Sequence, residues 1–138
     1  MSYFFYRQNN SGGWFDTDDK VCMCVIVEAQ DAEHANAFAE SIGIYFNGCD
    51  SGDDCECCGD RWYEVNDRDA TDVPLIYDKH PSEFVPWFIK EGAVFCRVYH
   101  ADGNVDEYVV PDDNKKRIKQ QSDSIMNAVN NLMKGTLQ

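Results

Sequence analysis

Basic residues are scarce in this chain of 138 residues, which has 12 lysines and arginines against 25 acidic residues and a net charge of −13. A surface this acidic repels phosphate backbones, so we expect no direct nucleic-acid binding through a basic footprint. An acidic protein could instead mimic nucleic acid and block a basic protein, although a solvated acidic surface that aids solubility is the simpler interpretation. The chain also lacks an apolar run of about 18 residues, and we therefore expect no membrane-spanning helix.

Motifs of known catalytic chemistry are missing as well. The sequence contains no nucleotide-binding loop, dinucleotide fingerprint or nucleophile elbow. Three histidines occur, and none stands in a zinc-protease or deaminase pattern: His34, His80 and His100. Residues 1–7 lack a basic segment followed by a long apolar stretch, so we expect no signal peptide and a cytosolic protein. The sequence gives no positive support for an enzyme.

Hydrophobic residues make up 43% of the chain, and aromatic residues make up 13% of it. This content is enough to form the core of one domain over residues 1–138. Alternating apolar residues predict five strands, at residues 3–8, 21–28, 61–65, 93–100 and 105–110. The last two strands flank Asp102-Gly103, a dipeptide typical of hairpin turns. The strand at 21–28 is apolar on both faces, which is typical of a central strand.

Helical spacing predicts helices in two long segments. Asp31 is placed to cap a helix over residues 32–42, and an apolar stripe follows it at i, i+3, i+4 and i+7. A longer amphipathic helix is predicted at about 113–134, with apolar residues at Ile118, Ile125, Val129 and Leu132. A short helix could also run from Ser82 through Phe88. We expect an α+β fold with a mainly antiparallel sheet and two helices on one face.

Four of the seven cysteines lie in the polar segment 49–59: Cys49, Cys55, Cys57 and Cys58. Cys55 and Cys58 form a C-x-x-C-G element, in which two intervening residues let both sulfurs face one ion and glycine permits the tight turn. An odd cysteine count in a cytosolic protein argues against a disulfide framework. The pattern predicts a structural zinc ion held by the four thiolates in this loop.

The fourth ligand is open to more than one assignment, because neighbouring side chains such as those of Cys57 and Cys58 tend to diverge. His80, His34 or a strand cysteine could replace Cys57. The alternative for the whole loop is a redox-active thiol pair, although such pairs usually open a helix after a strand. The three other cysteines lie in apolar strands and are expected to be small buried side chains: Cys22, Cys24 and Cys96.

Two polar clusters could bind a ligand. Arg7, Asn9 and Asn10 stand in a segment rich in amides and glycine, which suits a small polar or phosphorylated ligand. Arg61 and Trp62 directly follow the cysteine loop and could hold a nucleobase by stacking. The simpler alternatives are a hairpin turn for the first cluster and a core tryptophan beside an arginine that neutralises nearby acids for the second.

Three stretches carry a resemblance: Y-F-F-Y-R-Q-N-N-S-G-G at residues 3–13, the strand–helix unit at 25–49, and D-C-E-C-C-G-D-R-W-Y at 54–63. Together they resemble a family of small acidic proteins encoded by large tailed bacteriophages. The resemblance covers roughly residues 3–65 and is most specific at the cysteine loop. It implies expression in the cytoplasm of a bacterial host and an accessory role in host takeover or counter-defence.

The leading hypothesis is a non-enzymatic, zinc-stabilised phage accessory protein that acts by binding. Its partner would be a host protein or a small signalling nucleotide. The alternatives are a metal-dependent nucleotide hydrolase, which needs an open coordination position, and an acidic nucleic-acid mimic that blocks a basic host protein. The seven-residue spacing in the C-terminal segment could also support a homo-oligomer, although packing on the sheet is the simpler expectation.

Overall fold

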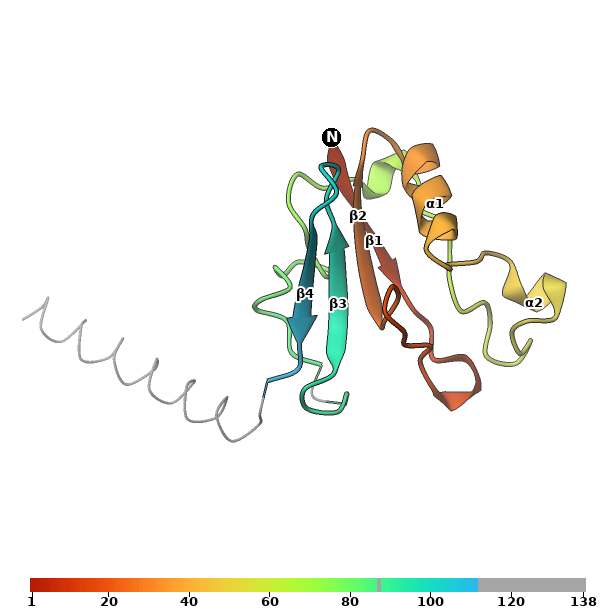
Figure 1. Cartoon of the computed structure of the whole chain (residues 1–138). Helices are drawn as coiled ribbons and strands as arrows, with labels where there is room; N and C mark the ends of the chain where they lie inside the picture. The colour runs from red at the N-terminus through yellow and green to blue at the C-terminus, as the bar shows by residue number, and fades with distance from the viewer. Residues whose placement is uncertain (87, 112–138) are drawn as a thin grey trace, which may run out of the picture.

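A computed structural model describes residues 1–86 and 88–111 of the chain, which form a four-stranded sheet with helices beside it (Figure 1). The predicted C-terminal helix at about 113–134 lies outside the described residues. In chain order the elements are β1 (Ser2–Arg7), the 3-10 helix η1 (Ser11–Gly13), β2 (Cys24–Ala29), α1 (Ala32–Ser41), α2 (Gly48–Ser51), the 3-10 helix η2 (Asp67–Asp69), β3 (Val94–Tyr99) and β4 (Val105–Val109).

The sheet has the strand order β1-β2-β3-β4 and is mixed. β1 and β2 pair antiparallel, as do β3 and β4, but the central pair β2 and β3 is parallel. The prediction of a mainly antiparallel sheet was therefore wrong. The physical reason is the long connection from β2 to β3, which carries α1 and returns the chain to the end of the sheet at which β2 began. An α+β arrangement, with α1 and the four-residue α2 among the described residues, is confirmed.

Helix α1 forms where local signals predict it. The side chain of Asp31 accepts a hydrogen bond from the backbone N–H of His34, which satisfies one of the free donors of the first turn. Three buried alanines let the helix lie close to β2 (Ala32, Ala35 and Ala39). The side chain of Asn36 accepts from the hydroxyl of Tyr6 and from the backbone N–H of Val65, so it ties the helix to β1 and to the segment after the cysteine loop.

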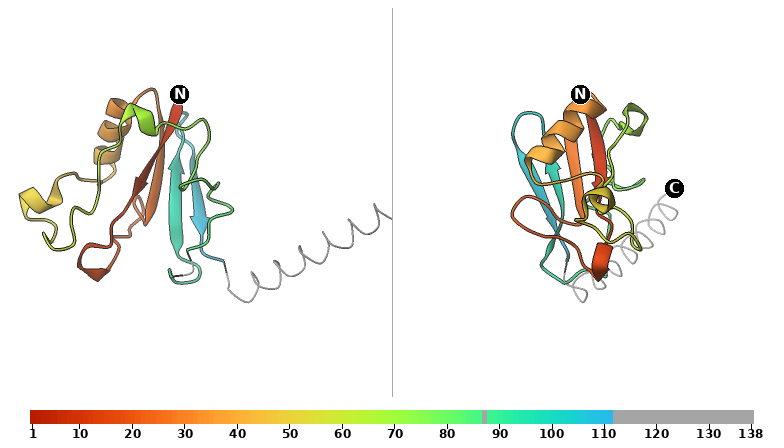
Figure 2. Two further views of the ribbon diagram at one scale, coloured as in Figure 1. Left: turned by 180° about the vertical axis from the view of Figure 1, so that it is seen from behind. Right: turned by 90° about the vertical axis from the view of Figure 1, so that its right-hand side faces the viewer.

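The two faces of the sheet are covered differently. On one face, α1 packs over Phe4, Tyr6, Val25 and Val27, and Trp62 joins this core. On the other face, the irregular segment at 70–92 covers the sheet, and its Ile76 is fully buried in that second core. Figure 2 shows this segment passing over β3 and β4 when the molecule is seen from behind. Because both faces are covered, β2 is a central strand, as its composition predicts.

Two local predictions were wrong within the described residues. The segment at 61–65 is not a strand, because its backbone bonds to single partners: the carbonyl of Arg61 accepts from Asn9, and the N–H of Val65 donates to a side chain. Residues 81–83 form a turn where a helix from Ser82 was expected. No helix in the described part of the chain is long and apolar enough to cross a membrane.

Candidate metal centre

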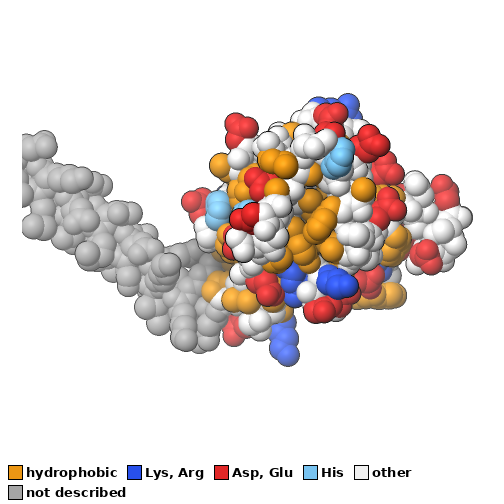
Figure 3. All heavy atoms as spheres, turned by 45° about the horizontal axis from the view of Figure 1, so that its top comes forward, with side chains coloured by type: hydrophobic (Ala, Val, Ile, Leu, Met, Phe, Trp, Pro, Cys, Tyr) orange, Lys and Arg blue, Asp and Glu red, His pale blue; other side chains and the backbone are white. Residues whose placement is uncertain are grey.

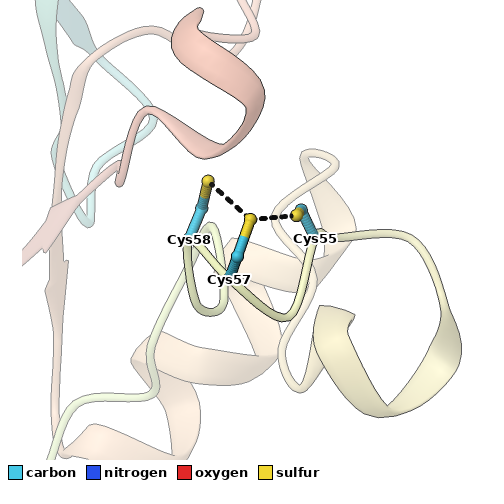
Figure 4. Close-up of side chains that lie close together, drawn as sticks. All are labelled: Cys55, Cys57 and Cys58. Carbon is cyan, nitrogen blue, oxygen red and sulfur yellow. Dashed lines mark hydrogen bonds between the residues drawn. The ribbon is translucent and has the colours of Figure 1, made fainter.

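Three cysteines of the loop at 49–59 bring their sulfurs together. The Sγ atoms of Cys55, Cys57 and Cys58 all lie within 4.8 Å of one another, with 2.6 Å between Cys55 and Cys57 and 3.6 Å between Cys57 and Cys58. Figure 4 shows the three side chains converging from one turn of the chain. All three residues are exposed, and they form the group of metal-ligating side chains found among the described residues. The neighbours Cys57 and Cys58 therefore do not diverge.

Cys49 is the fourth predicted ligand, and the structure does not bring its sulfur into this group. Its thiol donates to the backbone carbonyl of Cys55 at 3.5 Å, so it lies one peptide group away from the cluster. Burial and the neighbouring carboxylate of Asp60 raise the pKa of the Cys49 thiol to about 11. The alternative ligands are engaged elsewhere, since His34 bonds to Asp31 and His80 bonds to Ser82.

The backbone of the loop favours a thiolate at Cys55. Its carbonyl accepts from the N–H of Cys58 and of Gly59, and Gly59 adopts a φ of 84°, the left-handed conformation that the C-x-x-C-G pattern predicts. The pKa of the Cys55 thiol is lowered because the thiol of Cys57 donates to its sulfur, as do the backbone N–H groups of Cys57 and Cys58. Hydrogen bonds from the Cys57 thiol to Cys55 and Cys58 hold its proton in place, and they raise the pKa of Cys57 to about 11. A soft cation could replace that proton.

Two carboxylates hold the loop against the rest of the protein. Asp54 is buried, and its side chain accepts from the hydroxyl of Tyr45 at 2.7 Å and from the backbone N–H of Arg61 at 2.8 Å. Burial and this bond to Asp54 raise the pKa of Tyr45 to about 12. Asp60 accepts from the backbone N–H of Cys49 at 2.9 Å. Neither role could be found from the sequence, in which these two residues are indistinguishable from the other acids of the loop.

Asn9 contacts the cysteine loop directly. Its side-chain amide donates to the carbonyl of Cys58 at 2.7 Å and to that of Asp60 at 3.2 Å, and its backbone N–H donates to the carbonyl of Arg61. Sequence analysis placed Asn9 in a ligand-binding cluster. In the structure, its amide is used to join the end of β1 to the turn that carries the thiols.

Arg61 connects the same two regions from the interior. Its guanidinium donates to the side chain of Gln8 and to the carbonyls of Ser11 and Trp14, at distances of 2.8 to 3.0 Å. The Nε atom lies 3.2 Å from a carboxylate oxygen of Asp16 and 3.7 Å from one of Asp54, but its N–H is not aligned to either and makes no hydrogen bond within the described part of the chain. Arg61 is thus held by the hydrogen bonds of its two terminal nitrogens and by the charge of two nearby carboxylates.

The predicted ligand-binding residues are divided between the surface and the core. Arg61 and Trp62 are buried, and Trp62 is only 1% exposed, which leaves no aromatic face for a base to stack on. The simpler alternative of a core tryptophan beside an arginine that neutralises acids describes both residues. Arg7 and Asn10 are exposed, and the guanidinium of Arg7 lies 6.0 Å from the centre of the Tyr77 ring.

A pocket of about 390 Å³ opens beside the cysteine loop. Its lining combines Arg7 and Asn9 with the rings of Phe5 and Tyr63, and its other residues are Glu64, Val65 and Asp69. Tyr63 is 57% exposed and its hydroxyl lies near the position that a side chain on Gly59 would take. Tyr63 is therefore the exposed aromatic residue at this site, in place of its neighbour Trp62.

The other cysteines are structural. Cys22, Cys24 and Cys96 are fully buried, as their apolar surroundings predict, and Cys24 lies opposite Cys96 in the parallel pair of strands. Burial raises the pKa of all three thiols, to about 11 for Cys22. These thiols are therefore protonated at neutral pH and inert compared with those of the loop.

Comparison with known families gives one match, to a family described as a domain of unknown function, DUF7296, over residues 1–118. The chain belongs to this family. The DUF7296 match spans all the described elements and includes the cysteine loop. No curated protein and no solved structure matches the chain. The family description carries neither a source nor an activity, so the resemblance to phage proteins stays a prediction.

Proposed function

We propose that this DUF7296 protein is a non-enzymatic binding protein whose cysteine loop is fixed by one structural zinc ion. The observation that carries the proposal is the convergence of three thiols on one point, at Cys55, Cys57 and Cys58. The loop otherwise has little reason to be ordered, because its residues are mostly exposed and several are acidic. A bound cation would neutralise these charges and supply the free energy that the missing core cannot.

The donor set fits zinc. Sulfur ligands select a soft or borderline ion over calcium or magnesium, and zinc holds four thiolates in a tetrahedron at about 2.3 Å. Such a tetrahedron has sulfur–sulfur edges of about 3.8 Å, which the 3.6 Å between Cys57 and Cys58 nearly meets. Cys55 and Cys57, at 2.6 Å, would separate by about 1 Å. Cys49 would leave the carbonyl of Cys55 to complete the set.

A closed site of four thiolates leaves no position for a substrate, so the ion would act on structure. Its effect would reach the end of β1 through Asn9, which bonds to the carbonyls of Cys58 and Asp60. The pocket beside the loop would be fixed in the same way, because Asn9 lines it together with Arg7 and Tyr63. We place the binding surface at this pocket, next to the metal.

The ligand of the pocket follows from its lining. A guanidinium, an amide and two aromatic rings in about 390 Å³ suit a planar ring that carries an anionic group, such as a small nucleotide. The carboxylates of Glu64 and Asp69 also line the pocket, and they would accept hydrogen bonds from the amino or hydroxyl groups of such a ligand. The resemblance to phage proteins adds a host protein as the other partner, with the bacterial host cytoplasm as the place of action. A thermal-shift screen with mono-, di- and cyclic nucleotides tests the first partner, and Arg7→Ala should abolish any shift that binding at this pocket produces.

A metal-dependent nucleotide hydrolase is the second candidate, because one observation favours it: the sulfur of Cys49 lies outside the group of three. Three protein ligands and one open position are the arrangement of a catalytic zinc site. In that case Cys49 would not bind the ion, and the open position would hold a water molecule.

Metal analysis of the purified protein tests the zinc site, and Cys49→Ser separates the two candidates. We expect about one zinc per chain in the wild type, and much weaker zinc binding in Cys49→Ser, Cys55→Ser and Cys58→Ser. Cys22→Ser is the matched control and should keep its zinc. An unchanged zinc affinity in Cys49→Ser would favour the open site, and a wild-type protein without metal would reject both candidates.

A further inference from the structure

The face of the sheet that carries α1 is covered over only half of its width. Val25 and Val27 of β2 pack under the helix, and their partners across β3 and β4 lie on the same face: Val27 is opposite Tyr99, which is opposite Val105. Beyond α1, the segment at 18–21 lies on part of this face, where its carbonyls accept from the side chains of Arg97 and Tyr99, but the side chains of β4 have no covering layer in the described part of the chain. Val105 is 45% exposed and Val109, four residues further along β4, is 53% exposed.

A groove of about 510 Å³ runs along this uncovered strip, between α1 and β4. Its apolar residues include Val27, Phe38, Tyr99 and Val105, and the rings of Phe38 and Tyr99 lie 5.3 Å apart. Figure 3 looks toward this end of the molecule and shows hydrophobic side chains gathered between two histidines, with acidic side chains on several sides and basic side chains at the lower edge. An apolar strip of this kind on a sheet face normally packs against another element.

Acidic side chains lie along part of the rim of the groove. Its rim carries His34 and His100, and each of these histidines is paired with a carboxylate, Asp31 at 2.6 Å and Asp106 at 2.7 Å. Glu28 also lines the groove, where its carboxylate accepts from the backbone N–H of Ala101. The occupant that fits is therefore apolar on one side and basic at its edges.

We propose that the chain's own C-terminal segment, residues 112–138, occupies this groove. The segment begins directly after β4, the strand that forms one wall of the groove. It has the required composition, with Ile118, Ile125 and Leu132 at seven-residue intervals and four basic residues within positions 115–119. A segment of 27 residues is long enough to run back along β4, since five strand residues span roughly 17 Å and even a helix of 27 residues spans roughly 40 Å.

Charge distinguishes this occupant from a second copy of the protein. Residues 1–111 contain 22 acidic and 7 basic residues, whereas residues 112–138 contain 3 acidic and 5 basic residues. Contact between two acidic bodies would place like charges together, which costs free energy. The C-terminal segment thus carries a net charge of +2 against −15 for residues 1–111, and attachment to β4 gives it a high effective concentration at the groove.

Photo-crosslinking in the full-length chain tests the proposal. Benzoylphenylalanine replaces Phe38 in the groove and, as the control, Tyr77, which is 56% exposed and contacts Phe5 and Phe84 on the opposite face of the sheet. We expect the probe at position 38 to form intramolecular links to residues 112–138 in monomeric protein, and the probe at position 77 to form none. Links from position 38 to a second chain, or no link to 112–138, would overturn the proposal.

A second pair of variants separates docking from mere proximity. Ile125→Glu places a charge on the apolar repeat, and Gln120→Glu places the same charge at a position that helical spacing would set on the opposite side. We expect Ile125→Glu to reduce the yield of links from position 38 several-fold and to raise amide hydrogen exchange in β4. Gln120→Glu should leave both close to the wild type, and equal effects of the two variants would contradict a specific fit.

Discussion

The side chain of Arg61 shows how one residue can hold two regions of a protein together. Its guanidinium is buried and donates to Gln8, Ser11 and Trp14, while its backbone N–H donates to Asp54 in the cysteine loop. A buried charge with this many partners is stabilising only while all of them are present. Its removal leaves two carbonyls and a side-chain amide without their donor.

We expect Arg61→Met to lower the free energy of unfolding by roughly 3 to 5 kcal/mol, because the variant keeps the apolar stem but loses the buried charge and its hydrogen bonds. Urea unfolding, followed by tryptophan fluorescence, measures the difference. Arg68→Met is the control, since Arg68 is exposed and its replacement should change stability by about 0.5 kcal/mol or less. A loss of less than about 1 kcal/mol in Arg61→Met would show that water can replace the guanidinium.

At the scale of single residues, the sequence predicts which cysteines are buried, but it does not predict which polar side chains join distant segments. The burial of Cys22, Cys24 and Cys96 follows from the apolar residues that flank them, which is local information. The placement of Arg61 depends on a segment about 50 residues away in the chain, so no local pattern contains it. For this reason the sequence pattern indicates that Arg61 binds a ligand, whereas its side chain lies in the interior of the structure.

At the scale of elements, the cysteine loop is a turn that depends on backbone conformation. Gly59 has a φ of 84°, and a Cβ atom there would lie 3.1 Å from the hydroxyl of Tyr63. An L-residue in the left-handed region is strained by about 1 to 2 kcal/mol. The conformation brings the amide groups of the turn into place around the thiols, so strain at this position opposes the geometry that the proposed zinc site needs.

We expect Gly59→Ala to weaken zinc binding roughly five- to thirty-fold, because the free loop can relax the strain and the metal-bound loop cannot. Competition with a chromophoric zinc chelator measures the affinity. Gly103→Ala is the matched control, since Gly103 also has a positive φ, of 93°, but lies in the β3–β4 turn, where an added Cβ atom would meet nothing within 4 Å. It should reduce stability and leave the zinc affinity unchanged, and equal affinities of the two variants would argue against the proposed turn geometry.

Elements whose signals are local were predicted well. Helix α1 begins after Asp31 and ends within one residue of its expected bound, because its cap and its alanine stripe lie within the helix itself. The segment at 61–65 has the composition of a strand but forms none, since β1 already pairs with β2 on one side and with a single bridge at Thr71 on the other. Strand formation needs a partner, which composition does not reveal.

At the scale of the whole molecule, charge and topology dominate. The net charge of −13 produces repulsion within the folded protein, and most of the acidic side chains in the described residues are exposed. The few internal ion pairs centre on Arg61 and Arg97. Dissolved salt should therefore stabilise the folded protein, because it screens more repulsion between acidic side chains than attraction within ion pairs.

We expect sodium chloride to raise the melting temperature of the zinc-loaded protein by several degrees between about 0.01 and 0.3 M, a range over which the screening length falls several-fold. Differential scanning calorimetry measures the change. The double variant Asp50→Asn with Asp53→Asn, which removes two exposed charges from the cysteine loop, should show a smaller response. A melting temperature that falls with salt would mean that attractive pairs outweigh the repulsion.

The sequence by itself determined the class of fold, the helix α1, the hairpin of β3 and β4 and the position of the cysteine cluster that could hold a metal ion, because each depends on residues that are neighbours in the chain. The tertiary structure alone decided that β2 and β3 run parallel, that Arg61 and Trp62 are internal, and that Cys49 lies outside the group formed by the three other loop thiols. These features depend on contacts between distant segments. Such contacts are fixed by how the whole chain packs, and no short pattern records them.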